Sequence, residues 1–251
     1  MTHHPVRSVL NALRHGNIRR AEECSTLLRW LDPKPGERIL DVGCGDGYYD
    51  SIIAGSGAHV TGIDIHEQRL RLARRRFGGA RTDFLWMDGE RMDLAAASFD
   101  KAVSFCVIEH FSDDESAIRN VSKALKKGGL FVFSADSLSH PGIRPKEREF
   151  HRRLFAVHVY YTRETVEPKL ARAGFEIVRT QYLHNSSRSL RLFRLSWKLD
   201  ALRGWRRIFR TAGYAALGSI GQVILRTSQQ RTDGPENGLT LLVMARRRAD
   251  P

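Results

Sequence analysis

The sequence contains few cysteines and no long apolar run. Its three cysteines, Cys24, Cys44 and Cys106, are widely spaced, and this odd number suggests neither a disulfide framework nor a zinc cluster. No run of 18 apolar residues is present, so we expect no membrane-spanning helix. The first 20 residues lack the apolar centre of a secretory signal, and we therefore expect a cytoplasmic protein.

Acidic residues are scarce relative to basic ones. The chain has 41 lysines and arginines against 28 acids, which gives a formal net charge of +13. Much of this charge lies between Arg188 and Arg231, where ten basic residues accompany one acid, Asp200. Such a segment favours an anionic partner, either a membrane surface or a nucleic acid.

Apolar and turn-forming residues alternate along the first two thirds of the chain. Their spacing predicts helices at residues 18–31, 48–56, 67–77, 113–125 and 162–173, and strands at residues 38–42, 59–65, 82–87, 99–105, 130–134, 175–183 and 239–246. This alternation is typical of an α/β protein in which helices cover both faces of a parallel sheet. We expect an N-terminal helical segment at 1–36 and one main domain at 37–251.

Two stretches interrupt that alternation. Residues 140–158 are polar and contain Pro141 and Pro145, so we expect a loop or lid there. Residues 190–236 separate the last two expected strands and form a basic, apolar insertion. At 126–129 the sequence Lys-Lys-Gly-Gly predicts a basic last helical turn with a glycine stop.

A glycine-rich turn follows the first expected strand. Residues 39–47 read Ile-Leu-Asp-Val-Gly-Cys-Gly-Asp-Gly, an apolar run that ends in an acid and continues into three alternating glycines. Glycine lets a backbone turn sharply and approach a ligand closely. The helix expected from Tyr48 would direct its free N–H groups toward this turn. The pattern predicts a loop that binds a nucleotide-like cofactor.

Further motifs follow this loop in order. They are Asp64 at the end of the second strand, Asp88 after the third, Phe99-Asp100 at the start of the fourth, Val107-Ile-Glu-His-Phe111 after it, and Leu125-Lys-Lys-Gly-Gly-Leu130 before the fifth. Together with the glycine loop they resemble the class I S-adenosylmethionine-dependent methyltransferases, over about residues 18–174 and again from 239. Nicotinamide-binding folds commonly use G-x-G-x-x-G, which differs from the G-x-G-x-G found here.

The resemblance implies a Rossmann-like, doubly wound, mainly parallel seven-stranded sheet with N-terminal helices and a helical insertion between the last two strands. It also implies S-adenosylmethionine as the cofactor. Asp41 and the glycine loop would hold the methionine end, Asp64 both ribose hydroxyls, and Asp88 the adenine amino group. The expected cofactor residues are Asp41, Gly43, Cys44, Gly45, Gly47, Asp64, Ile65, Met87, Asp88, Gly89 and Phe105. Two alternatives stay open: Asp64 could only cap the next helix, and Asp93 could replace Asp88.

The segment after the fourth strand bears on the methyl acceptor. Cys106 lacks the preceding proline of cytosine-C5 methyltransferases, and no Asn/Asp-Pro-Pro-aromatic motif of amino-methylating enzymes follows. The sequence Cys-Val-Ile-Glu-His resembles the small-molecule and lipid-quinone branch, in which oxygen or carbon is commonly the acceptor. His110 and His158 are the candidate bases, with a structural hydrogen bond as the alternative for each. We expect no metal.

The basic insertion predicts an interfacial helix. Leu195, Leu199, Leu202, Trp205 and Phe209 share one helical stripe, with basic side chains on its flanks. Trp and Arg in this arrangement suit an anionic lipid surface. A soluble helical pair that completes the core or forms a dimer is the alternative, and the sequence leaves the oligomeric state open.

Three hypotheses for function therefore stand. The first is methylation of oxygen or carbon on a small or lipid-linked acceptor, with peripheral membrane contact. The second is an RNA methyltransferase or RNA-binding protein that uses the same basic insertion. The third is a non-catalytic relative, against which the retained Asp41, Asp64 and Asp88 argue.

Overall fold

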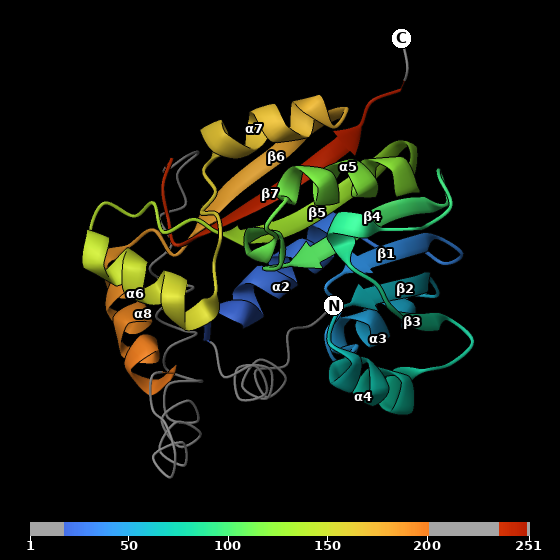
Figure 1. Cartoon of the computed structure of the whole chain (residues 1–251), viewed down its shortest axis with the longest axis horizontal. Helices are drawn as coiled ribbons and strands as arrows, with labels where there is room; N and C mark the ends of the chain where they lie inside the picture. Colours follow the sequence, from blue (N-terminus) through green and yellow to red (C-terminus); the bar gives the residue numbers. More distant parts are fainter. Residues whose placement is uncertain (1–17, 201–235, 250–251) are drawn as a thin grey trace. The chain divides into compact units, whose positions relative to one another are not determined.

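A single sheet organises the protein. The computed structural model describes residues 18–200 and 236–249. These form a seven-stranded sheet in the order β3–β2–β1–β4–β5–β7–β6 (Figure 1). The strands are β1 (Arg38–Val42), β2 (His59–Asp64), β3 (Thr82–Trp86), β4 (Phe99–Phe105), β5 (Leu125–Asp136), β6 (Phe175–Leu183) and β7 (Thr240–Arg247). The pairs β1–β2, β1–β4, β2–β3 and β4–β5 are parallel, which confirms the expected α/β fold.

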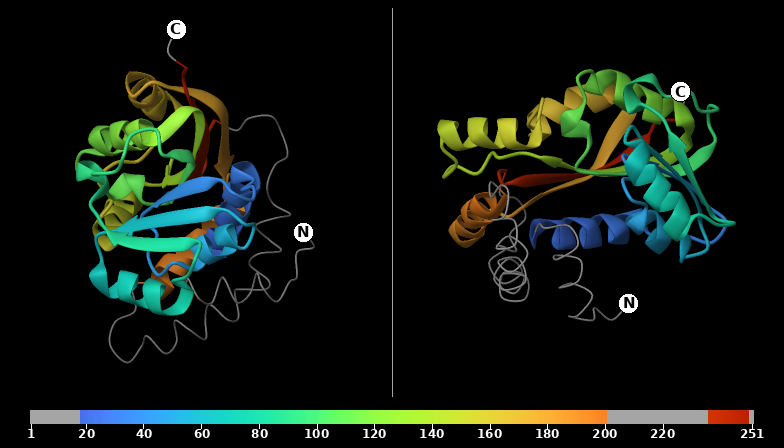
Figure 2. Two further views of the ribbon diagram at one scale, coloured as in Figure 1. Left: turned by 90° about the vertical axis from the view of Figure 1, so that its right-hand side faces the viewer. Right: turned by 60° about the horizontal axis from the view of Figure 1, so that its bottom comes forward.

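Helices cover both faces of this sheet. On one face lie α3 (Tyr48–Ala54) and α4 (Glu67–Phe77), and on the other lie α5 (Asp114–Ala124) and α7 (Arg163–Arg172) (Figures 1 and 2). The short 3₁₀ helices η1 (Gly89–Arg91) and η2 (Ile108–His110) follow β3 and β4. The central strands are apolar on both faces because both are covered: Ile39 and Leu40 of β1 and Val103 of β4 are each 0% exposed.

The chain divides into two compact units. The first, here called the sheet unit, comprises residues 27–136, 158–181 and 241–251, and the second comprises residues 1–26, 137–157 and 182–240. Helix α2 (Ile18–Leu31) contributes residues to both. The expected division at residue 36 stays a prediction, and residues 201–235 of the expected insertion lie outside the described residues.

Two helices of the second unit pack through aromatic side chains. They are α6 (Pro145–Phe155) and α8 (Ser187–Asp200). The ring of His151, which is 1% exposed, lies 5.1 Å from Trp197 and 5.8 Å from Phe193 between ring centroids. Arg194 holds Glu147 through two contacts, Nε–Oε1 at 2.7 Å and Nη2–Oε2 at 3.0 Å.

The expectation of a loop over residues 140–158 is wrong, because α6 lies within it. Pro145 occupies the first turn of α6, where a missing N–H costs nothing, so the proline starts the helix and does not prevent it. The backbone N–H of Arg144 donates to Glu147 Oε2 at 2.9 Å and completes this start. Whether the segment covers the sheet edge stays a prediction.

The expectation of a helical turn at 126–129 is also wrong. Helix α5 ends at Ala124, and β5 begins at Leu125, which pairs with Phe99 of β4. Lys126 Nζ contacts Asp100 Oδ1 at 2.7 Å. Pairing with β4 therefore takes these residues into the sheet.

Within the described ranges, no helix has the length and hydropathy needed to cross a bilayer.

Candidate functional site

The glycine loop lies where the winding of the sheet changes direction. The chain leaves β1 toward β2 on one side and reaches β4 on the other, and ligands of open α/β sheets bind outside the carboxyl ends of strands at such a point. Gly43, Gly45 and Gly47 all have positive φ, at 84°, 58° and 76°. A Cβ on Gly43 would overlap Val107, and one on Gly47 would lie 2.6 Å from the Phe84 ring. The loop conformation therefore requires glycine at these positions.

Asp41, at the end of β1, is 1% exposed. Among the described residues, its carboxylate oxygens are satisfied by no donor other than the neighbouring carboxyl group of Asp50. A buried carboxylate without a partner is costly unless a ligand satisfies it. The predicted cofactor carries an ammonium group on its methionine end, and this group fits such a carboxylate. Burial, together with the carboxylate of Asp50, raises the pKa of Asp41 well above its usual range.

Cys44 is a protonated thiol in this setting. Burial, followed by the carboxylates of Asp50, Asp41 and Asp64, raises its pKa. Because a thiol must be ionised to attack, the geometry disfavours a nucleophilic role. All three cysteines of the chain are buried and stand outside any disulfide.

Asp64 ends β2 and joins two loops. Gly45 N–H donates to its Oδ2 at 2.9 Å, and His66 N–H donates to its Oδ1 at 2.8 Å. Each carboxylate oxygen can accept a further hydrogen bond, so these contacts leave room for ribose hydroxyls. The bond to His66 lies at the start of α4, as the helix-capping alternative also expects. Ile65, the next residue, is 54% exposed.

The residues after β3 lie beside the end of β2. The N–H of Met87 donates to the Asp64 carbonyl at 3.1 Å, and Asp88 Oδ1 accepts the N–H of Glu90 at 2.9 Å. Gly89 is buried, and a Cβ there would lie 2.7 Å from the Phe111 ring. Asp88 is half-buried, whereas its competitor Asp93 is exposed. The placement favours Asp88 for a ligand contact.

Phe105 and Cys106 lie where the chain leaves β4. Phe105 is 6% exposed, and its ring stacks on Tyr49 of α3 at 4.7 Å between centroids. Cys106 follows with a positive φ of 51°, and its N–H donates to Ser134 Oγ of β5 at 3.0 Å. This bond fixes where the chain leaves β4.

The structure brings the two candidate bases to the same part of the sheet edge. The carbonyl of Glu109 accepts the N–H of His158 at 2.8 Å and the N–H of Val159 at 3.2 Å. Glu109 itself is fully buried, and its Oε1 accepts the Asp136 N–H at 3.1 Å. His110, beside Glu109, and His158 are both exposed. Glu109 thus holds the two histidine segments together, and the roles of both histidines stay predictions.

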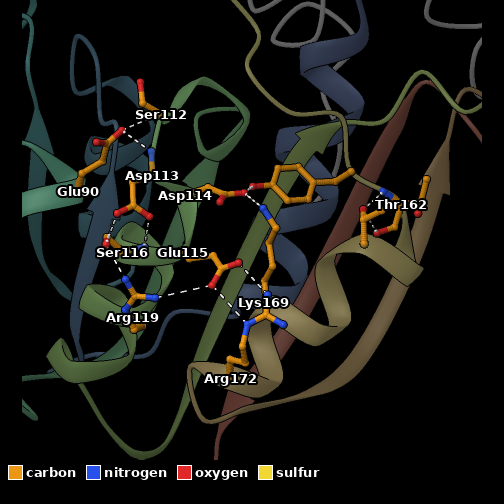
Figure 3. A network of polar contacts seen from close by, with 12 residues as sticks. Glu90, Ser112, Asp113, Asp114, Glu115, Ser116, Arg119, Thr162, Lys169 and Arg172 are labelled. Atoms are coloured by element: carbon orange, nitrogen blue, oxygen red, sulfur yellow. Dashed lines mark hydrogen bonds and ion pairs between the residues drawn. The ribbon is translucent and has the colours of Figure 1, made fainter.

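A polar network holds the His158 segment in place (Figure 3). Asp114, at the start of α5, accepts hydrogen bonds from the Tyr161 hydroxyl and from Lys169 Nζ of α7. Burial, followed by the hydrogen bond to Asp114, raises the pKa of Tyr161. Tyr161 is therefore a packed structural residue. Glu90 Oε1 in the same view accepts the N–H of Ser112 at 2.6 Å and ties η1 to the start of α5.

Sequence reasoning missed Asp50 of α3. Its side chain is fully buried, and in the described part of the chain its carboxyl group contacts that of Asp41. The signal was available, since Asp50 lies three residues before Ile53 on the inward face of a short helix. Gly62 of β2 was missed with it: a Cβ there would lie 2.7 Å from both Asp50 Oδ1 and Cys44 Cβ. No group of three or more potential metal ligands occurs among the described residues.

Comparison with known families and proteins agrees with this geometry. Residues 40–133 match the family described as Methyltransferase domain. A ubiquinone biosynthesis O-methyltransferase of Idiomarina loihiensis is 38% identical over 102 residues, which cover 39% of this chain and 42% of that protein. An O-methyltransferase of Penicillium expansum is 27% identical over 86% of this chain and 74% of its own length. The chain spans about half the length of several ubiquinone enzymes that it matches.

Solved structures share the fold at low identity. Phosphoethanolamine N-methyltransferase 2 of Haemonchus contortus, in complex with S-adenosyl-L-methionine, has a TM-score of 0.67 at 18% identity, covering 91% of this chain and 53% of that one. The [4+2]-cyclase SpnF has a TM-score of 0.65 at 20% identity, covering 90% and 81%. One of these structures is named a methyltransferase and the other a cyclase, so the fold alone does not define the reaction.

Proposed function

Since the chain belongs to the class I S-adenosylmethionine-dependent methyltransferases, we propose that it transfers a methyl group from S-adenosylmethionine to a small or lipid-linked acceptor. The observation that carries the proposal is the glycine loop with the buried Asp41 at its start, whose carboxyl group has only another carboxyl group, Asp50, as its neighbour. Oxygen is the favoured acceptor atom and carbon the alternative, because the two relatives described above are named O-methyltransferases.

The residues around the loop suit the separate parts of the cofactor. Asp41 would hold the ammonium group, Asp64 the ribose hydroxyls, and Asp88 the adenine amino group. Buried carboxylates in this region also favour a cofactor that carries a positive charge. When bound, S-adenosylmethionine supplies an electrophilic methyl group on its sulfonium sulfur.

The chain's own contribution to the reaction is positioning and removal of one proton. For a hydroxyl acceptor, Asp41, Asp64 and Asp88 would hold the methyl donor beside the acceptor, and the bound donor would supply its methyl group to the acceptor oxygen. The hydroxyl proton then goes to His110 or His158. S-adenosylhomocysteine and the methylated acceptor are the products.

A labelled-methyl assay tests the proposal. Purified chain would be incubated with radiolabelled S-adenosylmethionine and, separately, small phenols, prenylated dihydroxyphenols, lipid extract and RNA. We expect transfer to a hydroxyl-bearing small or lipid-linked compound. Transfer to RNA alone, or no binding of S-adenosylhomocysteine by calorimetry, would contradict the proposal.

Substitution of the histidines tests the base. We expect either His110→Ala or His158→Ala to lower kcat by roughly 100-fold or more, because a general base contributes about that much. The affinity for S-adenosylhomocysteine should remain within about twofold, since neither histidine is assigned to the cofactor. His59→Ala, which removes an exposed histidine at the start of β2, is the matched control. Wild-type kcat in both histidine variants would rule out both as the base.

We further propose that α8 contacts an anionic membrane surface. Leu190, Phe193 and Trp197 form its buried face, whereas Leu195 is 42% exposed. Arg188, Arg191 and Lys198 are exposed on the same helix, and Phe150 of α6 is 46% exposed. Apolar side chains flanked by basic ones suit a lipid headgroup region. The remaining members of the expected stripe, from Leu199 onward, lie outside the described side chains.

A further inference from the structure

The buried face beside the glycine loop holds a second carboxyl group besides Asp41. Asp50 is 0% exposed, and Asp41 is 1% exposed. Within the described ranges, no other side chain donates to any of their four carboxylate oxygens, and the two carboxyl groups are close enough to hydrogen-bond to each other when one is protonated. Two buried carboxylates in contact are unstable when both are ionised, because each lacks solvation and repels the other.

The sheet register places the two groups next to each other. Asp41 of β1 pairs directly with Gly62 of β2, and neighbouring strands lie about 4.8 Å apart. Asp50 Oδ1 would lie 2.7 Å from a Cβ built on Gly62, so the missing side chain of Gly62 leaves the space that Asp50 fills. The two carboxyl groups therefore share one face of the sheet, directly beside the loop that would hold the cofactor's methionine end.

We propose that Asp41 and Asp50 share one proton in the cofactor-free protein and release it when the ammonium group of S-adenosylmethionine binds beside them. Asp50 is then a positioning residue that couples cofactor affinity to pH. This inference rests on the proposed function and deepens it. The released proton goes to solvent, and the ammonium group replaces its positive charge.

The surroundings of the pair support proton uptake near neutral pH. Burial is the main cause that raises the pKa of Asp50 to about 7, and the carboxylates of Asp46 and Asp64 add to it. Burial and Asp50 raise the pKa of Asp41. The thiol of Cys44 also faces Asp50 across Gly62. Below about pH 7 the pair holds a proton that the ammonium group must displace, so affinity should fall as the pH falls.

Calorimetry with S-adenosylhomocysteine, which carries the same ammonium group, measures this coupling. Titrations from pH 5.5 to 8 would be run in two buffers of different ionisation enthalpy. We expect release of about one proton per ligand at pH 6, and binding about tenfold weaker at pH 6 than at pH 8. Binding without proton release in the wild-type chain overturns the inference, and this measurement needs no variant.

Variants assign the proton to Asp50. In Asp50→Asn the amide can donate to Asp41, so we expect the dissociation constant to change less than about twofold over the same pH range. Asp83→Asn, which removes an exposed acid of β3, should keep the wild-type pH dependence. A pH dependence that persists in Asp50→Asn assigns the proton to another group and overturns the inference. If no S-adenosylhomocysteine binds at any pH, the proposed function itself fails.

Discussion

Gly62 shows how a single residue shapes this site. It lies inside β2, where a larger residue would ordinarily strengthen the strand. Glycine is required here because it has no side chain, and Asp50 and Cys44 occupy the adjoining space.

We expect Gly62→Ala to lower the free energy of unfolding by about 1–3 kcal/mol, the usual cost of overpacking a filled interior. Cys44 Cβ, 2.7 Å from the new methyl group, is fixed close to the backbone and cannot rotate away. Urea denaturation would measure the change.

Gly79→Ala is the matched control for this substitution, because a Cβ there meets nothing within 4 Å. It should leave stability within about 0.5 kcal/mol of the wild type. Equal stability of Gly62→Ala and the wild-type chain would show that the space above Gly62 can relax.

Sequence reasoning at the residue scale identified positions where a motif marks them. Asp64 ends β2 and accepts the N–H of Gly45 in the glycine loop, while the binding roles of Asp41, Asp64 and the loop glycines stay predictions. Asp50 of helix α3 was missed because its importance depends on Gly62, which lies on strand β2, 12 positions away in the chain. A pairwise contact of this kind is visible only after folding.

Between elements, a part-buried ion pair of Glu147 with Arg194 joins α6 to α8 beside their aromatic contacts. The hydrogen bonds from Arg194 are the main cause that lowers the pKa of Glu147 to about 2, with a further contribution from Arg144. A carboxyl group whose pKa is lowered by folding stabilises the folded state above its unfolded pKa of about 4.5. That stabilisation disappears as the pH falls toward 2.

We expect Glu147→Gln to lower the free energy of unfolding by about 1–2 kcal/mol at pH 7, since it leaves Arg194 without its anion. The difference from the wild-type chain should close between about pH 4.5 and pH 2, because wild-type Glu147 is protonated over that range. Denaturant unfolding at several pH values measures it.

Glu149→Gln on the same helix is the control. Glu149 contacts Arg153 at 2.6 Å, but both side chains are at least half exposed, so we expect a change below about 0.5 kcal/mol. If the free energy of unfolding of Glu147→Gln stays below that of the wild-type chain by a constant amount down to pH 2, the ion-pair explanation is contradicted.

Helix α6 also marks the limit of prediction from composition at the element scale. Pro141 and Pro145 indicated a loop, yet Pro145 begins the helix, and Glu147 meets Arg194 from 47 residues further along the chain. Likewise, Lys126 and Lys127 read as a helical end but lie in β5 beside β4. Partners distant in sequence decided both outcomes.

Charge is the property of the whole molecule that bears most on partners. The chain carries a formal net charge of +13, and α8 presents exposed basic side chains. Membrane contact through α8 should therefore depend on specific residues as well as on total charge.

We expect the chain to co-sediment with vesicles that contain anionic lipid at physiological salt, and to bind neutral vesicles less. The double variant Arg191→Ser with Lys198→Ser should weaken binding by about tenfold or more, because each basic residue near the surface contributes about 1 kcal/mol. Liposome co-sedimentation at several salt concentrations measures this.

Arg71→Ser with Arg75→Ser, two exposed arginines of α4, changes the net charge equally and serves as the control. Equal loss in both double variants would attribute binding to total charge and not to α8. No binding of the wild-type chain to anionic vesicles would remove the membrane proposal.

The sequence by itself determined the order of strands and helices in the sheet unit, the glycine loop and the acids that follow each strand. These depend on local periodicity and on residues close together in the chain, which short segments encode directly. Only the tertiary structure decided that Asp50 lies beside Asp41, that Glu109 joins the His110 and His158 segments, and that α6 packs on α8. Each of these depends on burial between segments distant in sequence, which removes water and leaves a few side chains to satisfy one another.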